Sequence, residues 1–269
     1  MPDAELFVLG SGSKGNAFVL KYRDATLLLD VGFSAREIER RMELAGLAPS
    51  SLVGLALTHE HGDHASGATR LARRHDIPLL ASFGTWHALA KGGEPCAFLP
   101  IGSTTPVDVG PFTVRASPTS HDAAEPVALG VTLPGGVSIG VAYDLGRPTQ
   151  SVRWFLRDRT CLVLEANHDE VLLRSSGYPP VVQQRIAGSG GHLSNLDAAR
   201  LLEDVHHEAL ATVVLAHMSL RCNTVEAARS VILPALIARG FQGGLIFAEQ
   251  NGPMAAIPLH PPHQATLFG

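Results

Sequence analysis

Short apolar runs separated by turn residues dominate the first half of the chain, and such runs indicate β-strands. Strands are expected over 5–10, 17–23, 25–31, 52–57, 78–82, 112–116, 128–133 and 137–142. The stretch 35–45 has a helical pattern, with Ser34 at the capping position and Gly46 as its stop. A second helix is expected over 65–75. The pattern therefore predicts strands interleaved with helices from the start of the chain.

The second half alternates longer helical patterns with apolar runs. Helices are expected over 150–156, 180–187, 195–205 and 225–238, and strands over 161–166, 212–216, 244–248 and 255–258. No internal repeat and no long linker divides these elements. The mixture predicts one α/β domain over residues 1–259, with helices packed outside its sheets. Residues 260–269 are expected to form a flexible tail.

Composition narrows the class of protein without indicating its chemistry. The 269 residues are 45% hydrophobic and carry a net charge of -4, so no global basic field attracts nucleic acid. Three scattered cysteines without CxxC spacing predict reduced thiols. The N-terminus lacks the pattern of a signal peptide, and no run approaches the ~18 apolar residues of a membrane span. We therefore expect a cytoplasmic protein that does not insert into a membrane.

A dense group of candidate metal ligands follows the expected strand at 52–57, in the segment Thr58-His59-Glu60-His61-Gly62-Asp63-His64. Imidazole and carboxylate are ligands that Zn²⁺ and similar divalent ions prefer. His59 and His61 alternate, so they point the same way in an extended segment. Asp63 and His64 follow a glycine that allows the chain to bend toward a second position. This spacing indicates two metal ions close together.

Three further candidate ligands lie just after apolar runs downstream. They are His121, Asp144 and His217. Two metal ions with open coordination positions need more than four protein ligands, and these positions would supply the remainder. Because each candidate repeats the placement of the first group at a strand end, we expect all of them to meet at one site.

This ordered set of residues resembles the metallo-β-lactamase-fold hydrolases. The shared features are the His-x-His-x-Asp-His motif, a lone His, a lone Asp after a strand and a final His before Met218-Ser219. The resemblance implies a four-layer αββα sandwich with the site at one edge between two sheets. It implies one metal ion held by His59, His61 and His121, a second held by Asp63, His64 and His217, and a bridge formed by Asp144 and a shared water.

Within that superfamily the chain is most similar to YycJ/WalJ-type proteins. The segments that carry this similarity are 9–16, 120–122, 165–169 and 191–195. Those proteins are regarded as 5′→3′ exonucleases that act on DNA, and ribonuclease Z and the cyclic-phosphate phosphodiesterases are similar in the C-terminal half. Gly62 departs from the pattern, because a hydroxyl residue is expected there. Arg221-Cys222 departs as well, because smaller and more polar residues are expected.

The resemblance implies a dinuclear phosphodiesterase that uses a metal-bridging hydroxide, with DNA as the expected substrate. Zn²⁺ is the expected metal, and Mn²⁺ also suits the ligands. Asp63 would orient the nucleophile, and His192 would approach the scissile phosphate and assist the leaving oxygen. Four residues at strand ends are expected to hold ligand imidazoles through hydrogen bonds: Asp30, Glu165, His168 and Asp169.

Two other functional classes remain open from the sequence. A small-molecule hydrolase that cleaves a cyclic phosphodiester or a thioester is favoured by the acidic pI and by the lack of a DNA-binding appendage. A binding module without turnover is disfavoured, because such a module has no physical need for a complete ligand set.

Several motifs have a simpler structural interpretation beside the functional one. The Gly12–Gly15 loop lacks the Lys-Ser/Thr of a P-loop, so a tight turn is favoured over a phosphate cradle. Arg70, Arg73 and Arg74 are more typical of a solvated helix face than of a nucleic-acid contact. Arg147 and Arg221 are better placed for such a contact, because each follows a candidate ligand by a few residues.

Overall fold

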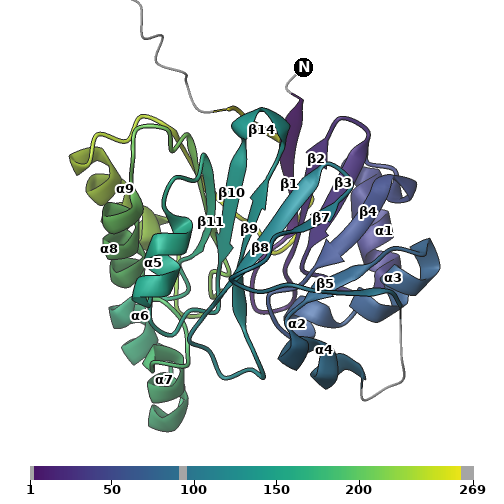
Figure 1. The fold of residues 1–269 in the computed structure, drawn as a ribbon. Helices are drawn as coiled ribbons and strands as arrows, with labels where there is room; N and C mark the ends of the chain where they lie inside the picture. Colours follow the sequence, from purple (N-terminus) through teal and green to yellow (C-terminus); the bar gives the residue numbers. More distant parts are fainter. Residues whose placement is uncertain (1–2, 91–95, 262–269) are drawn as a thin grey trace, which may run out of the picture.

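Two β-sheets face each other, and helices cover their outer faces (Figure 1). The computed structural model describes residues 3–90 and 96–261. The first sheet consists, in spatial order, of β14 (Ile257–Leu259), β1 (Ala4–Gly10), β2 (Ala17–Tyr22), β3 (Ala25–Leu29), β4 (Leu52–Ala56), β5 (Leu79–Ala81) and β6 (Phe98–Pro100). Strands β14 to β3 pair antiparallel, and β3 to β6 pair parallel.

The second sheet is likewise divided into an antiparallel half and a parallel half, and its strands come from the rest of the chain. Its spatial order is β13 (Gly244–Phe247), β12 (Thr212–Ala216), β11 (Cys161–Glu165), β10 (Ser138–Ala142), β9 (Val127–Thr132), β8 (Phe112–Pro118) and β7 (Val107–Val109). Strands β7 to β10 pair antiparallel, and β10 to β13 pair parallel.

The helices lie on the outer faces and complete four layers. Those of the first half are α1 (Ala35–Leu44), α2 (Gly62–Ala65), α3 (Ala68–His75) and α4 (Phe83–Ala90). Those of the second half are α5 (Gln150–Leu156), α6 (Glu170–Ser175), α7 (Pro180–Ala187), α8 (Asn195–Val205) and α9 (Val225–Ala238). Short 3₁₀ turns occur at Pro49–Ser51 and Pro134–Gly136.

Three apolar clusters hold the layers together. One fills the space between the sheets and includes Phe18, Phe112 and Val163. A second packs α1 and α3 on the first sheet, and a third packs α5, α8 and α9 on the second sheet. Burial of apolar side chains is the main stabilising contribution in such layers. The predicted αββα sandwich is confirmed.

The direction of the strands brings several strand ends to one edge of the sandwich. Strands β10, β11 and β12 are parallel, and β8 runs the same way because β9 is antiparallel to both of its neighbours. Their carboxyl ends therefore lie at the same edge of the second sheet. Strands β3 and β4 are likewise parallel. The loops that follow these ends can place side chains from distant parts of the sequence against one another.

Differences from the predicted elements are local. The helix expected over 65–75 begins later, as α3 at Ala68, and a separate short helix, α2, ends at Ala65. Between them the chain at Gly67 passes close to the preceding loop: a Cβ there would lie 2.2 Å from the backbone oxygen of Phe33. The final strand is Ile257–Leu259 rather than 255–258. Most of the expected flexible tail, 262–269, lies outside the described residues. Within the described ranges, every helix is too short or too polar to cross a membrane.

Candidate metal centre

The turn after β4 places four candidate ligands side by side. Helix α2 begins at Gly62, directly after the extended residues 57–61, and turns the chain back toward the sheet. His59 and His64 are buried, whereas His61 and Asp63 are half-buried and line a cleft. The bend that the sequence predicted at Gly62 therefore separates the two pairs of ligands.

A buried carboxylate at the end of β3 fixes this turn. Asp30 accepts hydrogen bonds from the backbone N–H and the hydroxyl of Thr58, each at 2.7 Å. Its Oδ2 also lies 2.7 Å from Nδ1 of His64. Because Nδ1 of His64 is engaged in this way, Nε2 is the nitrogen that remains for a metal ion. Asp30 thus lies where the sequence interpretation expected an imidazole-orienting residue.

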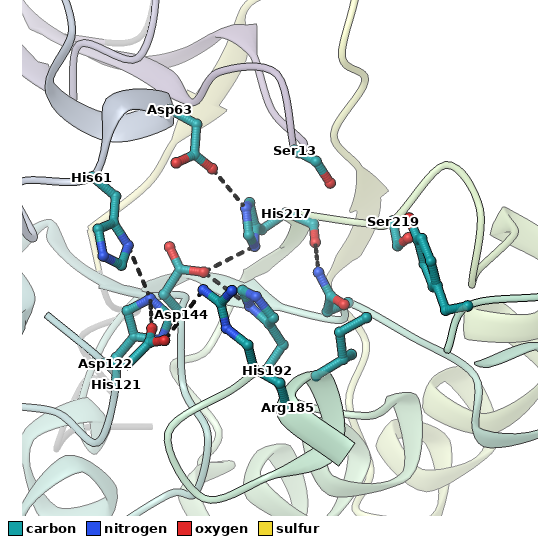
Figure 2. A pocket seen from close by; sticks show the side chains of 13 residues that line it. Ser13, His61, Asp63, His121, Asp122, Asp144, Arg185, His192, His217 and Ser219 are labelled. Carbon is teal, nitrogen blue, oxygen red and sulfur yellow. Dashed lines mark hydrogen bonds and ion pairs between the residues drawn. The ribbon is translucent and has the colours of Figure 1, made fainter. Parts of the chain in front are cut away.

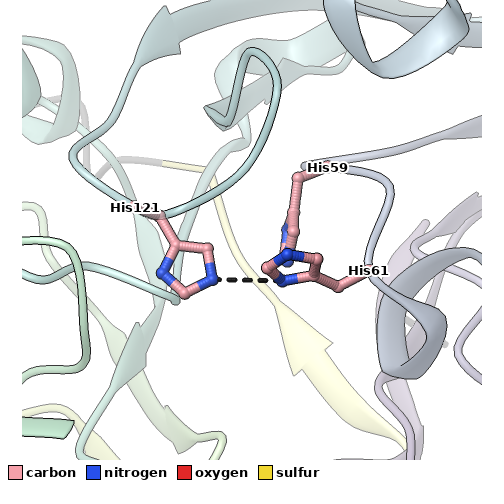
Figure 3. Close-up of side chains that lie close together, drawn as sticks. All are labelled: His59, His61 and His121. Atoms are coloured by element: carbon pink, nitrogen blue, oxygen red, sulfur yellow. Dashed lines mark hydrogen bonds between the residues drawn. The ribbon is translucent and has the colours of Figure 1, made fainter. Parts of the chain in front are cut away.

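The first candidate group consists of His59, His61 and His121, and His121 lies opposite the other two (Figure 3). One nitrogen from each ring lies within 4.8 Å of the other two. Nε2 of His121 is 3.3 Å from Nδ1 of His61. Burial and the neighbouring His64 lower the pKa of His59 well below its ordinary value. A neutral imidazole is the form that binds a metal ion.

Asp144 lies between this group and a second one. The second group consists of Asp63, His64 and His217. Oδ2 of Asp144 is 2.7 Å from Nε2 of His64 and 3.5 Å from Nε2 of His59. Its Oδ1 is 3.2 Å from Nδ1 of His217. The carboxylate is therefore in reach of both candidate metal positions.

Glu165, at the end of β11, organises the opposite wall. It is fully buried, and its Oε2 accepts hydrogen bonds from the backbone N–H groups of Leu145 (2.8 Å) and Leu193 (3.0 Å). Its Oε1 lies 2.8 Å from Nδ1 of His192 and 3.0 Å from Nδ1 of His217. Burial opposes the charged imidazolium of His192, but Glu165 and Asp144 raise its pKa to about 10. One carboxylate thus orients a candidate ligand and the predicted catalytic histidine together.

These contacts fit a site for divalent cations. Nε2 of His59 and Oδ2 of Asp144 are buried without a hydrogen-bond partner among the described residues. Burial lowers the pKa of His64, but Asp144 and Asp30 outweigh burial and raise that pKa well above its ordinary value. A cation bound between Nε2 of His64 and Oδ2 of Asp144, which lie 2.7 Å apart, would take the place of the ring's second proton. Leaving a buried polar atom unsatisfied costs about 1–3 kcal/mol. Imidazole and carboxylate donors suit Zn²⁺ and Mn²⁺.

The ionisation state of Asp63 also fits a site for divalent cations. Burial raises the pKa of this carboxyl group, but hydrogen bonds from His217 and His64 outweigh burial and hold the pKa well below its usual range. Oδ2 of Asp63 lies 3.4 Å from Nε2 of His217 and 3.5 Å from Nε2 of His64. Asp63 is therefore an ionised carboxylate at neutral pH, as a metal ligand must be.

The sequence of residues 10–164 matches the family model of the metallo-β-lactamase superfamily. The chain belongs to this superfamily. It is 33% identical to exodeoxyribonuclease YycJ of Bacillus anthracis over 243 residues, which cover 89% of this chain and 92% of that protein. It is 28% identical to exodeoxyribonuclease WalJ of Streptococcus pneumoniae D39, with coverage of 94% and 96%.

These similarities confirm the predicted superfamily and its YycJ/WalJ type, and they assign the chain to the metal-dependent hydrolases. A solved structure shows the same fold. The metallo-β-lactamase fold protein YhfI of Bacillus subtilis has a TM-score of 0.69 with this chain at 20% identity, covering 93% of this chain and 98% of YhfI.

The candidate metal centre opens into a polar cleft of about 210 Å³ (Figure 2). Its walls carry six of the predicted site residues: His61, Asp63, His121, Asp144, His192 and His217. They also carry residues that were not predicted as site residues: Ser13, Asp122, Asn167, Tyr178, Arg185, Ile186 and Ser219. Ser13, Asp122, Asn167 and Ser219 lie within the segments that carry the family similarity, whereas Tyr178 and Arg185 have no sequence signal. They reach the cleft only because α7 folds over its edge.

The loop between β1 and β2 is a further part of the site. Gly15 donates to the backbone oxygen of Gly12 at 3.1 Å, which makes the tight turn favoured from the sequence. On either side of that turn, the hydroxyl of Ser11 accepts from the backbone N–H of His217 at 2.8 Å, and Nδ2 of Asn16 lies 3.2 Å from Nε2 of His64. The loop therefore supports two candidate ligands, His64 and His217.

Two predicted imidazole-orienting residues are not brought to the ligands. The carboxylate of Asp169 accepts from the backbone N–H groups of Val171 and Leu172, both at 2.9 Å, and thereby caps α6. His168 is buried and lines a neighbouring hollow, with Nδ1 unpaired among the described residues. The direction of the chain after β11 turns both side chains away from the metal centre.

Proposed function

We propose that the chain is a dinuclear, metal-dependent phosphodiesterase that acts on nucleic acid, as a 5′→3′ exonuclease on DNA. One observation carries the proposal: Asp144 lies between two groups of ligand atoms, with His192 beside it on the wall of the cleft. The names of YycJ and WalJ as exodeoxyribonucleases support DNA as the substrate.

The ligands divide as the family resemblance implies. His59, His61 and His121 would hold one ion, Asp63, His64 and His217 the other, and Asp144 would contact both. Zn²⁺ is the expected ion and Mn²⁺ the second choice. Two such ions, when bound, lower the pKa of a water molecule and neutralise charge on the phosphoryl oxygens. Asp30 and Glu165 contribute by fixing the rings of His64 and His217.

Two side chains act directly on the reacting atoms. Asp63 is half-buried at the cleft, where its carboxylate orients the attacking water. Nδ1 of His192 is engaged by Glu165 and Asp144 at 2.8 and 2.9 Å, so Nε2 is left to face the substrate. Once the water has released a proton to solvent, its oxygen bonds to phosphorus as the ester P–O bond breaks, and His192 gives a proton to the departing oxygen.

Substitution of His192 tests this assignment. We expect His192→Ala to lower kcat for DNA by about 10²–10⁴-fold, because help from a general acid has that magnitude. The loss for bis-p-nitrophenyl phosphate should be much smaller, because p-nitrophenolate is a stable anion that leaves without a proton. Metal content, measured by mass spectrometry of the purified protein, should stay at the wild-type level. His87 supplies the matched control, because it is exposed on α4 and its ring pairs with the backbone oxygen of Phe83 instead of with a candidate ligand.

The outcomes separate the role of His192 from a structural one. His87→Ala should leave both kcat and metal content unchanged. If His192→Ala turned over DNA at the wild-type rate, His192 would have no part in the reaction. If it lost metal in proportion to activity, His192 would be a ligand rather than a proton donor.

A small-molecule hydrolase is the second candidate, because the cleft is only about 210 Å³ and the chain is acidic overall. A panel of substrates separates the two functions: 5′-labelled single- and double-stranded DNA, RNA, a cyclic nucleotide, a thioester and bis-p-nitrophenyl phosphate. The proposal expects shortening of labelled DNA from its 5′ end. Activity confined to the cyclic diester or the thioester would favour the second candidate.

A further inference from the structure

We propose that a groove on the outer face of the second sheet, between α5 and strands β8 to β10, binds a single strand of the nucleic-acid substrate outside the catalytic cleft. This inference rests on the proposed function. The groove is a hollow of about 510 Å³. Its walls carry Arg115, Trp154, Arg157 and Arg159, together with the hydroxyls of Ser117 and Ser151. Its chemistry is that of a site for a phosphodiester backbone with an unpaired base.

The sheet is built to bring two guanidinium groups together here. Arg115 on β8 pairs with Gly130 on β9, and Gly130 pairs with Gly140 on β10. Neither glycine has a side chain, and Arg159 lies over both: a Cβ would meet Arg159 Nη2 at 2.8 Å from Gly130 and Arg159 Cγ at 3.3 Å from Gly140. The side chain of Arg159 thus packs on Gly130 and Gly140, and it lies beside Arg115 in the groove.

The position of Arg159 is fixed from the helix side as well. Its Nε donates to the backbone oxygen of Phe155 at 3.2 Å, and its guanidinium lies 5.1 Å from the centre of the Phe155 ring. The guanidinium group has five N–H donors, and these contacts use only some of them. The remaining donors are presented to the groove without a long side chain having to be ordered when a ligand binds.

Positive charge in the groove is not balanced by ion pairs. Among the described residues, Arg115, Arg157 and Arg159 form no ion pair with a carboxylate, and exposed Asp158 is the one acidic residue of the lining. Burial, followed by repulsion from Arg115, lowers the pKa of Arg159 from its ordinary value, and attraction to Asp158 opposes this shift only in part. Like charges held together are destabilising, and a bound phosphate would remove that repulsion.

Trp154 supplies a surface for a base. Its side chain is 75% exposed, although it is a large aromatic residue on a helix whose other face is buried. The guanidinium of Arg157 lies 6.0 Å from its ring centre, on the same rim of the groove. Arginines beside an exposed aromatic ring are the combination that binds single strands without sequence preference, and stacking contributes about 1–3 kcal/mol per base.

The groove is continuous in the chain with the metal centre. Strand β8 leads from Arg115 through Ser117 to the loop that carries His121, six residues further on, which is at most about 20 Å. Exposed Arg147 lies between Asp144 and the start of α5. A strand of several nucleotides can reach from the cleft to the groove, whereas a small diester cannot. The groove would therefore distinguish polymers from small substrates.

Binding and kinetics of Arg115→Gln and Trp154→Ala test the proposal. Both side chains are at the surface, so the fold should tolerate the changes. We expect each variant to raise the KM for a 12-nucleotide single strand about tenfold, with kcat unchanged and with bis-p-nitrophenyl phosphate hydrolysis at the wild-type rate. Each variant should also weaken binding of a fluorescent phosphorothioate 12-mer, which resists hydrolysis, by about the same tenfold factor. For Arg115→Gln, the slope of log K against log salt should fall by about 0.7.

The matched control is Arg36→Gln, which removes one exposed charge on α1 over the other sheet, where Arg36 has no ion-pair partner in the described part of the chain. If Arg36→Gln and Arg115→Gln weakened 12-mer binding equally, only net charge would matter and the groove proposal would be wrong. Inorganic phosphate, added at the same total phosphate concentration as the 12-mer, should not displace the 12-mer, and a dinucleotide should bind more weakly. If phosphate did displace the 12-mer, or if the dinucleotide bound as tightly, the groove would bind free anions rather than a strand. Wild-type protein that cleaved no phosphodiester yet bound the 12-mer through Arg115 would contradict the proposed function alone.

Discussion

Asp30 illustrates how one buried carboxylate can determine the orientation of a metal ligand. Its backbone has a φ of 54°, in the left-handed region that Asp and Asn tolerate better than other side chains with a Cβ. That conformation turns the carboxylate toward Thr58 and His64 directly after the end of β3. The cost of the conformation is offset by three hydrogen bonds in the interior.

Substitution Asp30→Asn should weaken binding of the metal ion at His64. Asparagine keeps the shape and the backbone conformation, but its amide nitrogen cannot accept from Thr58 Oγ1 or from Nδ1 of His64. Loss of such a supporting contact lowers metal affinity by about 10–100-fold. Titration against a competing chelator measures the change, and the affinity of the His59, His61 and His121 group should remain nearer the wild-type value.

Asp76→Asn is the control, because Asp76 is exposed at the end of α3 and also has a positive φ, of 51°. It should bind both metal ions as tightly as wild type. Unchanged affinity in Asp30→Asn would show that His64 does not depend on Asp30 for its orientation.

The candidate ligands could be predicted from the sequence because each lies directly after an apolar strand and the strands meet at one edge. The supporting residues could not be predicted as a group. Glu165 and Asp169 lie four residues apart, yet Glu165 faces His192 and His217 while Asp169 caps α6. Which way a side chain points after a strand depends on the first turn of the next helix, and that turn is fixed by tertiary contacts.

Most of the longer elements were predictable from the sequence, whereas strands β6 and β7 and helices α4 and α6 were not. Strands β6 and β7 have three residues each, and they exist because β5 and β8 offer an edge to pair with. Helix α4 contains Gly84, Thr85 and Trp86, which are weak helix formers. Local propensity does not encode such elements, because the neighbouring sheet and loops stabilise them.

Helix α1 provides a prediction at the scale of an element. Glu37 in its first turn receives hydrogen bonds from Arg40 and from Arg41, both at 2.7 Å to Oε1, and Arg41 in turn donates to the backbone oxygen of Leu9 at the end of β1. The bonds from Arg40, then Arg41, lower the pKa of Glu37 to about 2 against the opposing effect of burial. We expect Glu37→Gln to reduce the free energy of unfolding at pH 7 by about 0.2–1 kcal/mol, the range for partly exposed ion pairs.

The sign of the pH dependence follows from the depressed pKa. The carboxylate stabilises the folded state above its unfolded pKa, near 4.5, and this contribution disappears as the pH falls through about 2. The difference between wild type and Glu37→Gln should therefore be smaller at pH 3 than at pH 7 in urea denaturation with a chelator present. An equal difference at both pH values would mean that Glu37 acts through packing rather than charge.

At the scale of the whole molecule, the site depends on the two sheets meeting at one edge. His59, His61, Asp63 and His64 come from the first sheet, and His121, Asp144 and His217 come from the second. The apolar cluster between the sheets fixes their separation, so any change in the packing of that cluster moves one set of ligands against the other. The complete centre exists only in the folded sandwich, which couples metal binding to stability.

The central claim is that two cations, held around Asp144, are required for phosphodiester hydrolysis. The most direct measurement removes metal with a chelator and then titrates Zn²⁺ or Mn²⁺ back, while bound metal and hydrolysis of bis-p-nitrophenyl phosphate are followed on the same sample. The account predicts that activity is lost on chelation and returns mainly between one and two bound equivalents. Full activity with one bound ion, or activity that survives complete removal of metal, would contradict it.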